Sequence, residues 1–280
     1  MPLTARPIVL IVLDGFGIAP PENSNAITLA QKPYFDSLLK EYPSMLLEAS
    51  GLNVGLPRNE VGNSEVGHVT IGSGILRYQS LPRIDKSIED GEFQRLPGLL
   101  KIKEKIASGN RKLHLMGLIG NGGVHASEKH LQALINWTKE QKIWNKTFIH
   151  AFLDGRDTGK DTGSIFMKEL QEFMKDKGKI ATFGGRFFGM DRNLNWDRIQ
   201  KAYDAIVFGK SESTCKDPLK QLKEFYRKEI YDEEVPPTVV TGKGDAPIAT
   251  IEDGDCVIYF NFRADRGRQM TEALVEPAFQ

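Results

Sequence analysis

One serine stands in a glycine-framed stretch, GNSEVGHVTIGSG at 62–74, and its setting could support phosphoryl chemistry. Gly62 and Asn63 tolerate the dihedral angles of a sharp turn, and the residues after Ser64 could begin a helix. One interpretation is an ordinary helix cap, in which the serine oxygen accepts a bond from a free backbone N–H. The other places Ser64 Oγ at a helix N-terminus that favours a phosphoryl group, where serine needs a base or a metal to react. No base is obvious beside it, because His68 lies four residues on, where packing would explain it equally well.

Asp14 is a second residue that could take part in chemistry, because of where it stands in the chain. It directly follows the apolar run IVLIVL at 8–13, which has the pattern of a strand buried on both faces. Open α/β sheets place their ligands at the carboxyl ends of such strands. An Asx turn before a loop explains an aspartate there equally well. Both interpretations therefore stay open at this point.

Four strands predicted further along the chain also end in turns that carry Arg, Asp or His. These turns are IGNGGVHAS with His125, DGRDTG with Asp154, Arg156 and Asp157, GGRFFGMDR with Arg186, Asp191 and Arg192, and RADRGR with Arg263, Asp265, Arg266 and Arg268. Strand ends in a parallel sheet share one edge, so we expect these loops to converge. A lone loop arginine is usually solvated, but so many on three such loops indicate a small, multiply anionic substrate. The chain has neither a GxxxxGK[ST] nor a strand–GxGxxG–helix pattern, so it lacks a nucleotide fingerprint.

The elements that must position these residues follow an α/β pattern. From about residue 93 onward, helix and strand patterns alternate in units of roughly 30 to 40 residues, which is typical of βαβ units. Strands are predicted at 113–118, 147–153, 180–183 and 256–262, with a weaker candidate at 238–240. Helices are predicted around 99–106, 131–135, 165–173, 199–206 and 219–225, the third of them ended by Gly178. Before this region we expect a helix from about residue 33 and a strand at 45–49.

Composition excludes several classes of partner. Lys+Arg and Asp+Glu number 37 each, so the formal net charge is zero and no general affinity for nucleic acid or acidic membrane is expected. The run at 8–13 is too short for a signal-peptide core or a membrane span. Cys215 and Cys256 show no metal-type spacing and are too few for a disulfide framework, so we expect a cytoplasmic protein.

Six blocks, in order along nearly the whole chain, carry a family resemblance: VLIVLDGFG, GNSEVGH, NGGVHAS, HAFLDGRDT, GGRFFGMDR and FNFRADRGRQ. Together they resemble the cofactor-independent (2,3-bisphosphoglycerate-independent) phosphoglycerate mutases. The resemblance implies interconversion of 3-phosphoglycerate and 2-phosphoglycerate, in glycolysis and gluconeogenesis, through a phosphoserine intermediate with two divalent metals, usually manganese. It also implies an alkaline-phosphatase-like metal domain, here its N-terminal part at 1–76, followed by an inserted phosphotransferase domain at 77–280. We expect a monomer that binds a small-molecule substrate.

The resemblance also assigns roles to individual residues. Ser64 is then the nucleophile that takes the phosphoryl group and contacts a metal, and Asp14 is a metal ligand at the same centre. The glycerate and its phosphate would be held by His125, Arg156, Asp157, Arg186, Arg192, Arg263 and Arg266. Coordination by a metal would supply the activation that Ser64 lacks, and arginines from the second domain would fix the acceptor in line.

Some residues depart from the family pattern. Asn121 stands where an aspartate is common, Ala126-Ser127 where Ser-His is common, and Gly159 begins GKDTG where a proline-rich turn is usual. The lysine and the His and Asp ligands that complete both metal sites in the family would follow Gln280. His114, His130 and His150 fall in strand or helix patterns and are interpreted as structural. We therefore expect this chain to be the N-terminal portion of a longer enzyme and inactive alone.

Two alternatives stay open beside the mutase. One is another metal-dependent phosphohydrolase or phosphomutase that shares the Asp14/Ser64 centre, although a plain phosphatase needs no second anion clamp. The other is a non-catalytic module that holds phosphoglycerate through its second domain alone. Titration with 3-phosphoglycerate, with and without manganese, separates these hypotheses.

Overall fold

Within residues 7–176 and 179–276, which the computed structural model describes, six strands form one sheet in the order β4-β5-β3-β2-β1-β6. The strands are β1 (Leu113–Leu118), β2 (Thr147–Leu153), β3 (Ile180–Gly185), β4 (Ser213–Cys215), β5 (Thr238–Val240) and β6 (Cys256–Tyr259). Strand β1 pairs in parallel with β2 and β6, and β2 pairs in parallel with β3. Strand β5 runs antiparallel to β3 and parallel to β4. The chain divides into two units, Met1–Gln79 and Ser80–Gln280, and the whole sheet belongs to the second.

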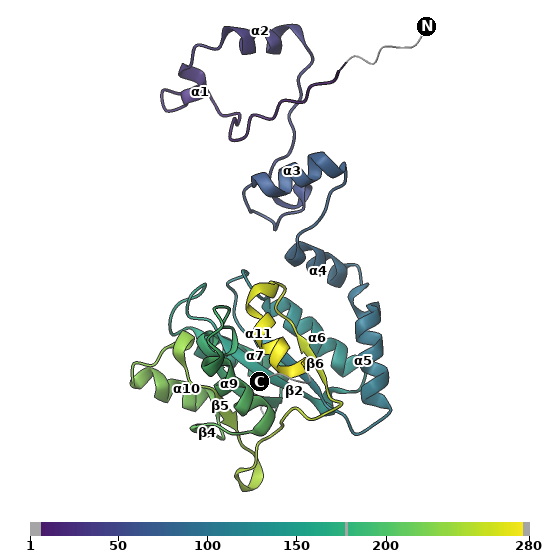
Figure 1. The fold of residues 1–280 in the computed structure, drawn as a ribbon, viewed down its shortest axis with the longest axis vertical. Coiled ribbons are helices and arrows are strands. Elements are labelled where there is room, and N and C mark those ends of the chain that lie inside the picture. The colour runs from purple at the N-terminus through teal and green to yellow at the C-terminus, as the bar shows by residue number, and fades with distance from the viewer. Residues whose placement is uncertain (1–6, 177–178, 277–280) are drawn as a thin grey trace. The chain divides into compact units, whose positions relative to one another are not determined.

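Helices cover both faces of this sheet in the second unit (Figure 1). They are α4 (Ser80–Glu89), α5 (Pro97–Ala107), α6 (Glu128–Glu140), α7 (Gly163–Met174), α8 (Arg186–Gly189), α9 (Trp196–Tyr203), α10 (Pro218–Arg227) and α11 (Arg268–Val275). Helix α7 packs against α10, and α9 against α11. The apolar spacing of α6 shows why it lies on the sheet, since Leu131, Leu134 and Ile135 share one face and are all buried.

The predicted strands and helices of the second unit are confirmed with small shifts. Strands 113–118 and 147–153 match β1 and β2 at both ends, because continuous apolar runs mark strands that are covered on both faces. Asp217 caps α10 as expected, accepting from Leu219 N and Lys220 N at 3.0 and 3.1 Å. Strand β6 ends at Tyr259 rather than at residue 262, although Phe260 N still donates to Met116 O. The predicted helix stop at Gly178 lies outside the described residues.

The first unit contains α1 (Ala26–Leu29), α2 (Pro33–Glu41), the 3₁₀ turn η1 (Gly51–Val54) and α3 (Ser64–Ser73). The expected helix near residue 33 is therefore confirmed. The predicted strands at 8–13 and 45–49 are wrong: both segments lack strand pairing, and their apolar side chains, including Leu10 and Leu46, are exposed. A strand exists only through bonds to a neighbouring strand, and the described part of this unit offers none.

Candidate active site

Ser64 is the first residue of α3, and the residue before it caps the helix. Asn63 Oδ1 accepts a hydrogen bond from Val66 N at 2.9 Å, so the interpretation of Ser64 as the cap is wrong. The serine hydroxyl is free of that task and donates instead to Asp14 Oδ2 at 2.6 Å. Two residues that the sequence separates by fifty positions thus meet in the first unit.

His68 is the nearest base to this pair. Its Nδ1 lies 3.1 Å from Ser64 Oγ and 2.8 Å from the backbone oxygen of Ser64, one helical turn earlier. The shorter contact is to a carbonyl, which only accepts, so it favours the tautomer with the proton on Nδ1. In that tautomer Nδ1 cannot take a proton from Ser64, and Asp14 is the acceptor that faces the hydroxyl.

The donor set at this position suits a hard divalent cation, in part. The carboxylate of Asp14 and the hydroxyl of Ser64 are oxygen ligands of the kind that manganese and magnesium prefer. Stable protein sites usually gather three or more protein ligands. Among residues 7–176 and 179–276, no three His, Cys, Asp or Glu side chains come together in a way that could hold a metal ion. The pair therefore fits one side of a metal centre.

Arg186 occupies the centre of a second group of candidate site residues, at the carboxyl end of the sheet. It follows β3 directly, it is 2% exposed, and its Nη1 donates to Asp154 Oδ1 at 2.5 Å and to Asp157 Oδ2 at 2.6 Å. Burial by itself lowers the pKa of Arg186, but the bonds to Asp157 and Asp154 outweigh it and raise that pKa. Burial likewise raises the pKa of Asp157, and the contacts with Arg186 reverse this, so both groups stay charged.

His125 joins this group from the loop after β1. Its Nε2 lies 3.8 Å from Asp157 Oδ2, and its Nδ1 is buried without a hydrogen-bond partner among the described residues. Burial, followed by the positive charges of Arg186 and Arg263, lowers the pKa of His125 from 6.5 to about 4. At neutral pH the imidazole is therefore uncharged.

Arg266 adds a cation that no carboxylate of the described residues pairs with at ion-pair distance. Its Nη1 donates to the backbone oxygen of Met190 at 3.2 Å, and its Nε is buried without a partner. Burial and then the charges of Arg186, Arg192 and Arg156 lower its pKa. These arginines repel one another in a partly desolvated place, which an anion bound there would relieve.

Two more arginines share one acid. Arg192 Nη1 lies 2.7 Å from Asp265 Oδ2, and Arg263 Nε lies 3.0 Å from Asp265 Oδ1. Both arginine side chains are almost half exposed, so they can turn toward a ligand at little cost. Arg156 is more exposed still, with Nη1 3.5 Å from Glu233 Oε1.

The expected convergence of the four loops is thus confirmed, and several partners come into view that sequence reasoning did not assign. Asp154 fixes Arg186, Asp265 bridges two arginines, and Asp191 gathers Asn195 and Gln269 beneath the third loop. All three stand inside the motifs that carry the arginines, which is a usable signal. Glu233 gives no such signal, because it lies between two unrelated elements.

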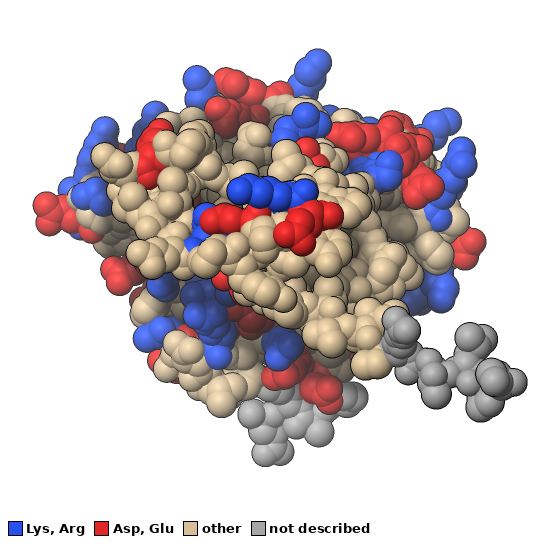
Figure 2. Space-filling view, turned by 90° about the horizontal axis from the view of Figure 1, so that it is seen from above, with Lys and Arg blue, Asp and Glu red and all other residues tan. Residues whose placement is uncertain are grey.

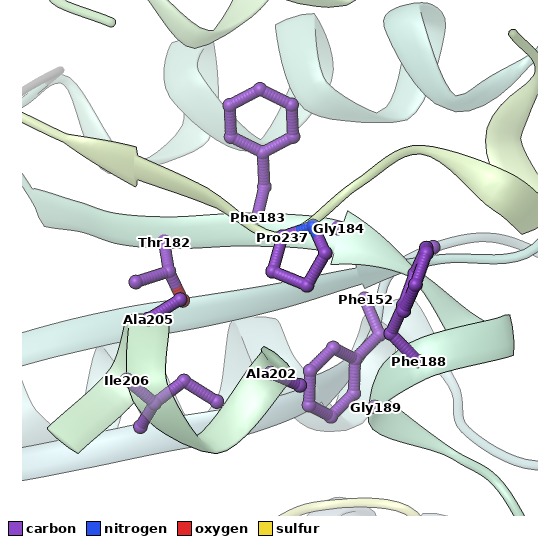
Figure 3. A pocket seen from close by; sticks show the side chains of 11 residues that line it. Phe152, Thr182, Phe183, Gly184, Phe188, Gly189, Ala202, Ala205, Ile206 and Pro237 are labelled. Atoms are coloured by element: carbon purple, nitrogen blue, oxygen red, sulfur yellow. The ribbon is translucent and has the colours of Figure 1, made fainter. Parts of the chain in front are cut away.

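Two cavities lie near this edge of the sheet, and they differ in kind. An open one of about 320 Å³ adjoins Arg263 and is also lined by Asn261, Arg268 and Thr271. The other, of about 10 Å³, lies under the third loop between Phe152, Phe188, Ile206 and Pro237 (Figure 3). The smaller one is mainly apolar and has room for at most about one water, so it is a packing defect rather than a ligand site.

One face of the surface carries charges of both signs (Figure 2). On the face drawn in Figure 2, Lys and Arg side chains stand among Asp and Glu side chains, and neither sign dominates. Within the part of the chain that the structure describes, no helix combines the length and the apolar character needed to cross a bilayer.

Comparison with known proteins shows the family. A family model described as "BPG-independent PGAM N-terminus" matches residues 84–280. The 2,3-bisphosphoglycerate-independent phosphoglycerate mutase of Clostridium perfringens is 44% identical over 99% of this chain and 54% of its own length. The mutase of the same name from Myxococcus xanthus is 43% identical over the same shares. A crystal structure of Leishmania mexicana phosphoglycerate mutase at low cobalt concentration matches with a TM-score of 0.73 and 31% identity, covering 96% of this chain and 51% of that one.

Fold and site together define an α/β protein whose strand ends carry a cluster of arginines and carboxylates. The chain belongs to the 2,3-bisphosphoglycerate-independent phosphoglycerate mutase family. It spans about half the length of the curated relatives that it matches.

Proposed function

We propose that this chain serves the interconversion of 3-phosphoglycerate and 2-phosphoglycerate, in the cytoplasm, through a phosphoserine at Ser64. The observation that carries the substrate class is Arg266, a partly buried cation whose charged neighbours are mainly other arginines. A phosphoglycerate carries a carboxylate and a phosphate, the two groups that arginine binds with paired hydrogen bonds. The alternatives are a different phosphoryl-transfer reaction and binding without turnover.

Each residue around Arg186 then has a role in binding the substrate that follows from its position. Arg186, held by Asp154 and Asp157, presents a fixed positive charge. Neutral His125 lies beside Asp157, where it borders the ligand without adding charge. The more exposed side chains, Arg156, Arg192 and Arg263, close over the bound anion. Holding the acceptor hydroxyl in line with the phosphoryl group is the main demand of phosphoryl transfer, and rigid side chains meet it best.

Asp14 and Ser64 supply the first unit's share of the chemistry. Asp14 accepts a hydrogen bond from the Ser64 hydroxyl and holds Oγ in one direction, at the start of α3. The free N–H groups of that first turn favour an arriving phosphoryl group. Divalent metals, which we assign as manganese, would be held in part by these two oxygens and would stabilise the alkoxide and the phosphoryl charge.

Calorimetric titration of the 280-residue chain with 3-phosphoglycerate tests the proposal. We expect binding without added metal, loss of that binding in Arg266→Ala, and unchanged affinity in Ser64→Ala. We also expect no turnover by this chain with manganese, because two protein oxygens hold a metal weakly. In any form of the enzyme that does turn over, Ser64→Ala should abolish the reaction. Absence of 3-phosphoglycerate binding, or near-normal turnover by Ser64→Ala, would contradict the proposal.

A further inference from the structure

A short segment between α10 and β5 lies against two loops of the candidate site. This is the 3₁₀ turn η6 (Asp232–Glu234). A Cβ placed on Gly155, after β2, would come within 2.7 Å of Glu233 N, and one on Gly185, at the end of β3, within 2.0 Å of Glu233 O. Such close approach requires glycine at both positions. The segment therefore touches the backbone of both loops close to the residues that form the Asp154–Arg186–Asp157 group.

Asp232 binds both the end of the 154–163 loop and the start of the helix after it. Its side chain is fully buried, its backbone N donates to Lys160 O at 2.9 Å, and its Oδ2 accepts from Gly163 N at 2.7 Å. Gly163 begins α7, whose preceding residue, Thr162, makes no side-chain cap bond. Asp232 thus performs from another element the capping task that helix starts require.

Tyr226, on α10, completes the arrangement. Its hydroxyl donates to Asp232 Oδ1 and accepts a hydrogen bond from Ser164 N at 3.1 Å. The first two backbone N–H groups of α7 are therefore both bound, one by the aspartate and one by the tyrosine. The 154–163 loop is held at its Lys160 and Gly163 end by this pair. At its other end Arg156 contacts Glu233, 3.5 Å away.

We infer that Asp232 and Tyr226 are positioning residues, which hold the 154–163 loop so that Asp154, Arg156 and Asp157 face the phosphoglycerate. This inference rests on the proposed function. The pair makes no hydrogen bond to the side chain of any arginine of the site in the described structure, so it acts only through the loop. Asp157 lies 2.6 Å from Arg186, and a shift of the loop by about 1 Å would break that register and misplace both charges.

Two variants of the 280-residue chain test the inference. Tyr226→Phe removes one hydroxyl and keeps the ring. Asp232→Asn replaces one acceptor oxygen by an NH2 group, so a donor then faces either Gly163 N or the Tyr226 hydroxyl. The matched control is Tyr203→Phe, whose ring packs 5.7 Å from that of Phe208 and whose hydroxyl has no hydrogen bond to a described residue. Affinity for 3-phosphoglycerate, the urea midpoint of unfolding, and deuterium exchange of the backbone amides are measured for each.

We expect the affinity for 3-phosphoglycerate to fall about tenfold in both variants, within the range typical of substitutions that act through a neighbouring element. Exchange of the Gly163 and Ser164 amides should quicken at least as much, while the amides of β1 and β2 stay protected. The control should change neither quantity. If Asp232→Asn does not fold, Tyr226→Phe decides the question by itself.

Two outcomes overturn the inference. One is a lower unfolding midpoint with unchanged affinity, which would make the pair structural only. The other is unchanged exchange at Gly163 and Ser164. If the unaltered chain fails to bind 3-phosphoglycerate, the proposed function fails, and the exchange measurement alone then decides whether the pair holds the loop.

Discussion

The two units of the chain differ in how they bury apolar side chains. Among the described residues of Met1–Gln79, Leu56 is the one buried hydrophobic side chain, and the apolar run at 8–13 is exposed. In Ser80–Gln280, side chains such as Trp137, Leu115 and Ile149 are almost completely buried around the sheet. Burial of apolar surface is the main favourable term in folding. The second unit therefore has a core of its own, and the first has local structure without one.

The two parts of the candidate site differ in the same way, in how firmly packing holds their side chains. Asp14 and Ser64 meet through one hydrogen bond between exposed segments. Arg186, Asp154 and His125 are each nearly fully buried and are fixed by the ends of three neighbouring strands. A binding site on a rigid sheet edge is preorganised, and a reactive group on a weakly packed segment is not. From this contrast we expect ligand binding by the second unit to be separable from chemistry at Ser64.

Limited proteolysis should show the contrast most strongly. We expect cleavage within 7–79 to be faster by about two orders of magnitude or more than cleavage in the sheet, because it needs no global unfolding. Mass spectrometry should identify a resistant fragment that begins near residue 80. A resistant fragment that begins before residue 60, or early cuts in β1 or β2, would show that the first unit is as well packed as the second.

Much of this contrast could be predicted from local patterns, and the failures have a physical reason. Continuous apolar runs predicted β1 and β2 with correct ends, since both faces of each strand are covered by elements of its own unit. The same pattern predicted a strand at 8–13, which is wrong. A strand needs a neighbouring strand to pair with, and the apolar pattern of one segment does not show whether such a neighbour is present. The direction of β5 relative to β3 could not be predicted either, because it too depends on which strands become neighbours.

The candidate site divides in a similar way. The arginines stood out because their loops follow strands, and the structure brings those loops together. Their roles in binding, like the metal role of Asp14, stay predictions. Asp232 and Tyr226 escaped notice, since their contacts with Gly163 and Ser164 span more than sixty residues and involve backbone groups. A sequence pattern shows side-chain types, and it does not show which backbone N–H needs an acceptor.

A second prediction concerns the buried ion pairs of Arg186. We expect Arg186→Met to lower the free energy of unfolding by about 3–5 kcal/mol, because Asp154 would stay buried without its cation. The matched control is Arg227→Met on the surface of α10, where the pair with Glu224 contributes at most about 1 kcal/mol. Urea unfolding at neutral pH measures both. Equal losses in the two variants would mean that the Arg186 group is not a rigid part of the second unit.

The pH dependence of stability should come mainly from the second unit. Burial, with smaller opposing contributions from Asp255, lowers the pKa of His114 from 6.5 to about 4, and burial also lowers the pKa of His150. Between pH 6.5 and 4, His114 therefore binds a proton in the unfolded chain but not in the folded chain. Stability is therefore fully present above about pH 6.5 and is lost as the pH falls toward 4, by up to about 3 kcal/mol for His114.

The titration of Asp232 changes stability in the opposite direction, so a variant of Asp232 can test this pH dependence. Burial, then the charges of Asp161 and Asp154, raises the pKa of Asp232 from 3.8 to about 6. The folded chain therefore gains stability from this group as the pH falls through 6. Asp232→Asn removes the gain, so the loss between pH 7 and 5 should become steeper than in the unaltered chain. Urea unfolding at several pH values measures the slope, and an unchanged slope in Asp232→Asn would contradict the assignment to this group.

The smallest expected effect separates a partly buried arginine, Arg266, from a more exposed one, Arg263, in the same loop. Lysine keeps the charge but loses the planar fork of arginine. In Arg266→Lys the Nε that is buried without a partner and the bond to Met190 O are both lost, so we expect weaker 3-phosphoglycerate binding by about 1–3 kcal/mol. Arg263 is almost half exposed and pairs with Asp265, so Arg263→Lys should cost less, toward the lower end of that range. Calorimetric titration of both variants gives the comparison directly. Unchanged affinity in both would show that this loop does not reach the ligand, and a larger loss in Arg263→Lys would show that the exposed arginine, rather than the buried one, makes the specific contact.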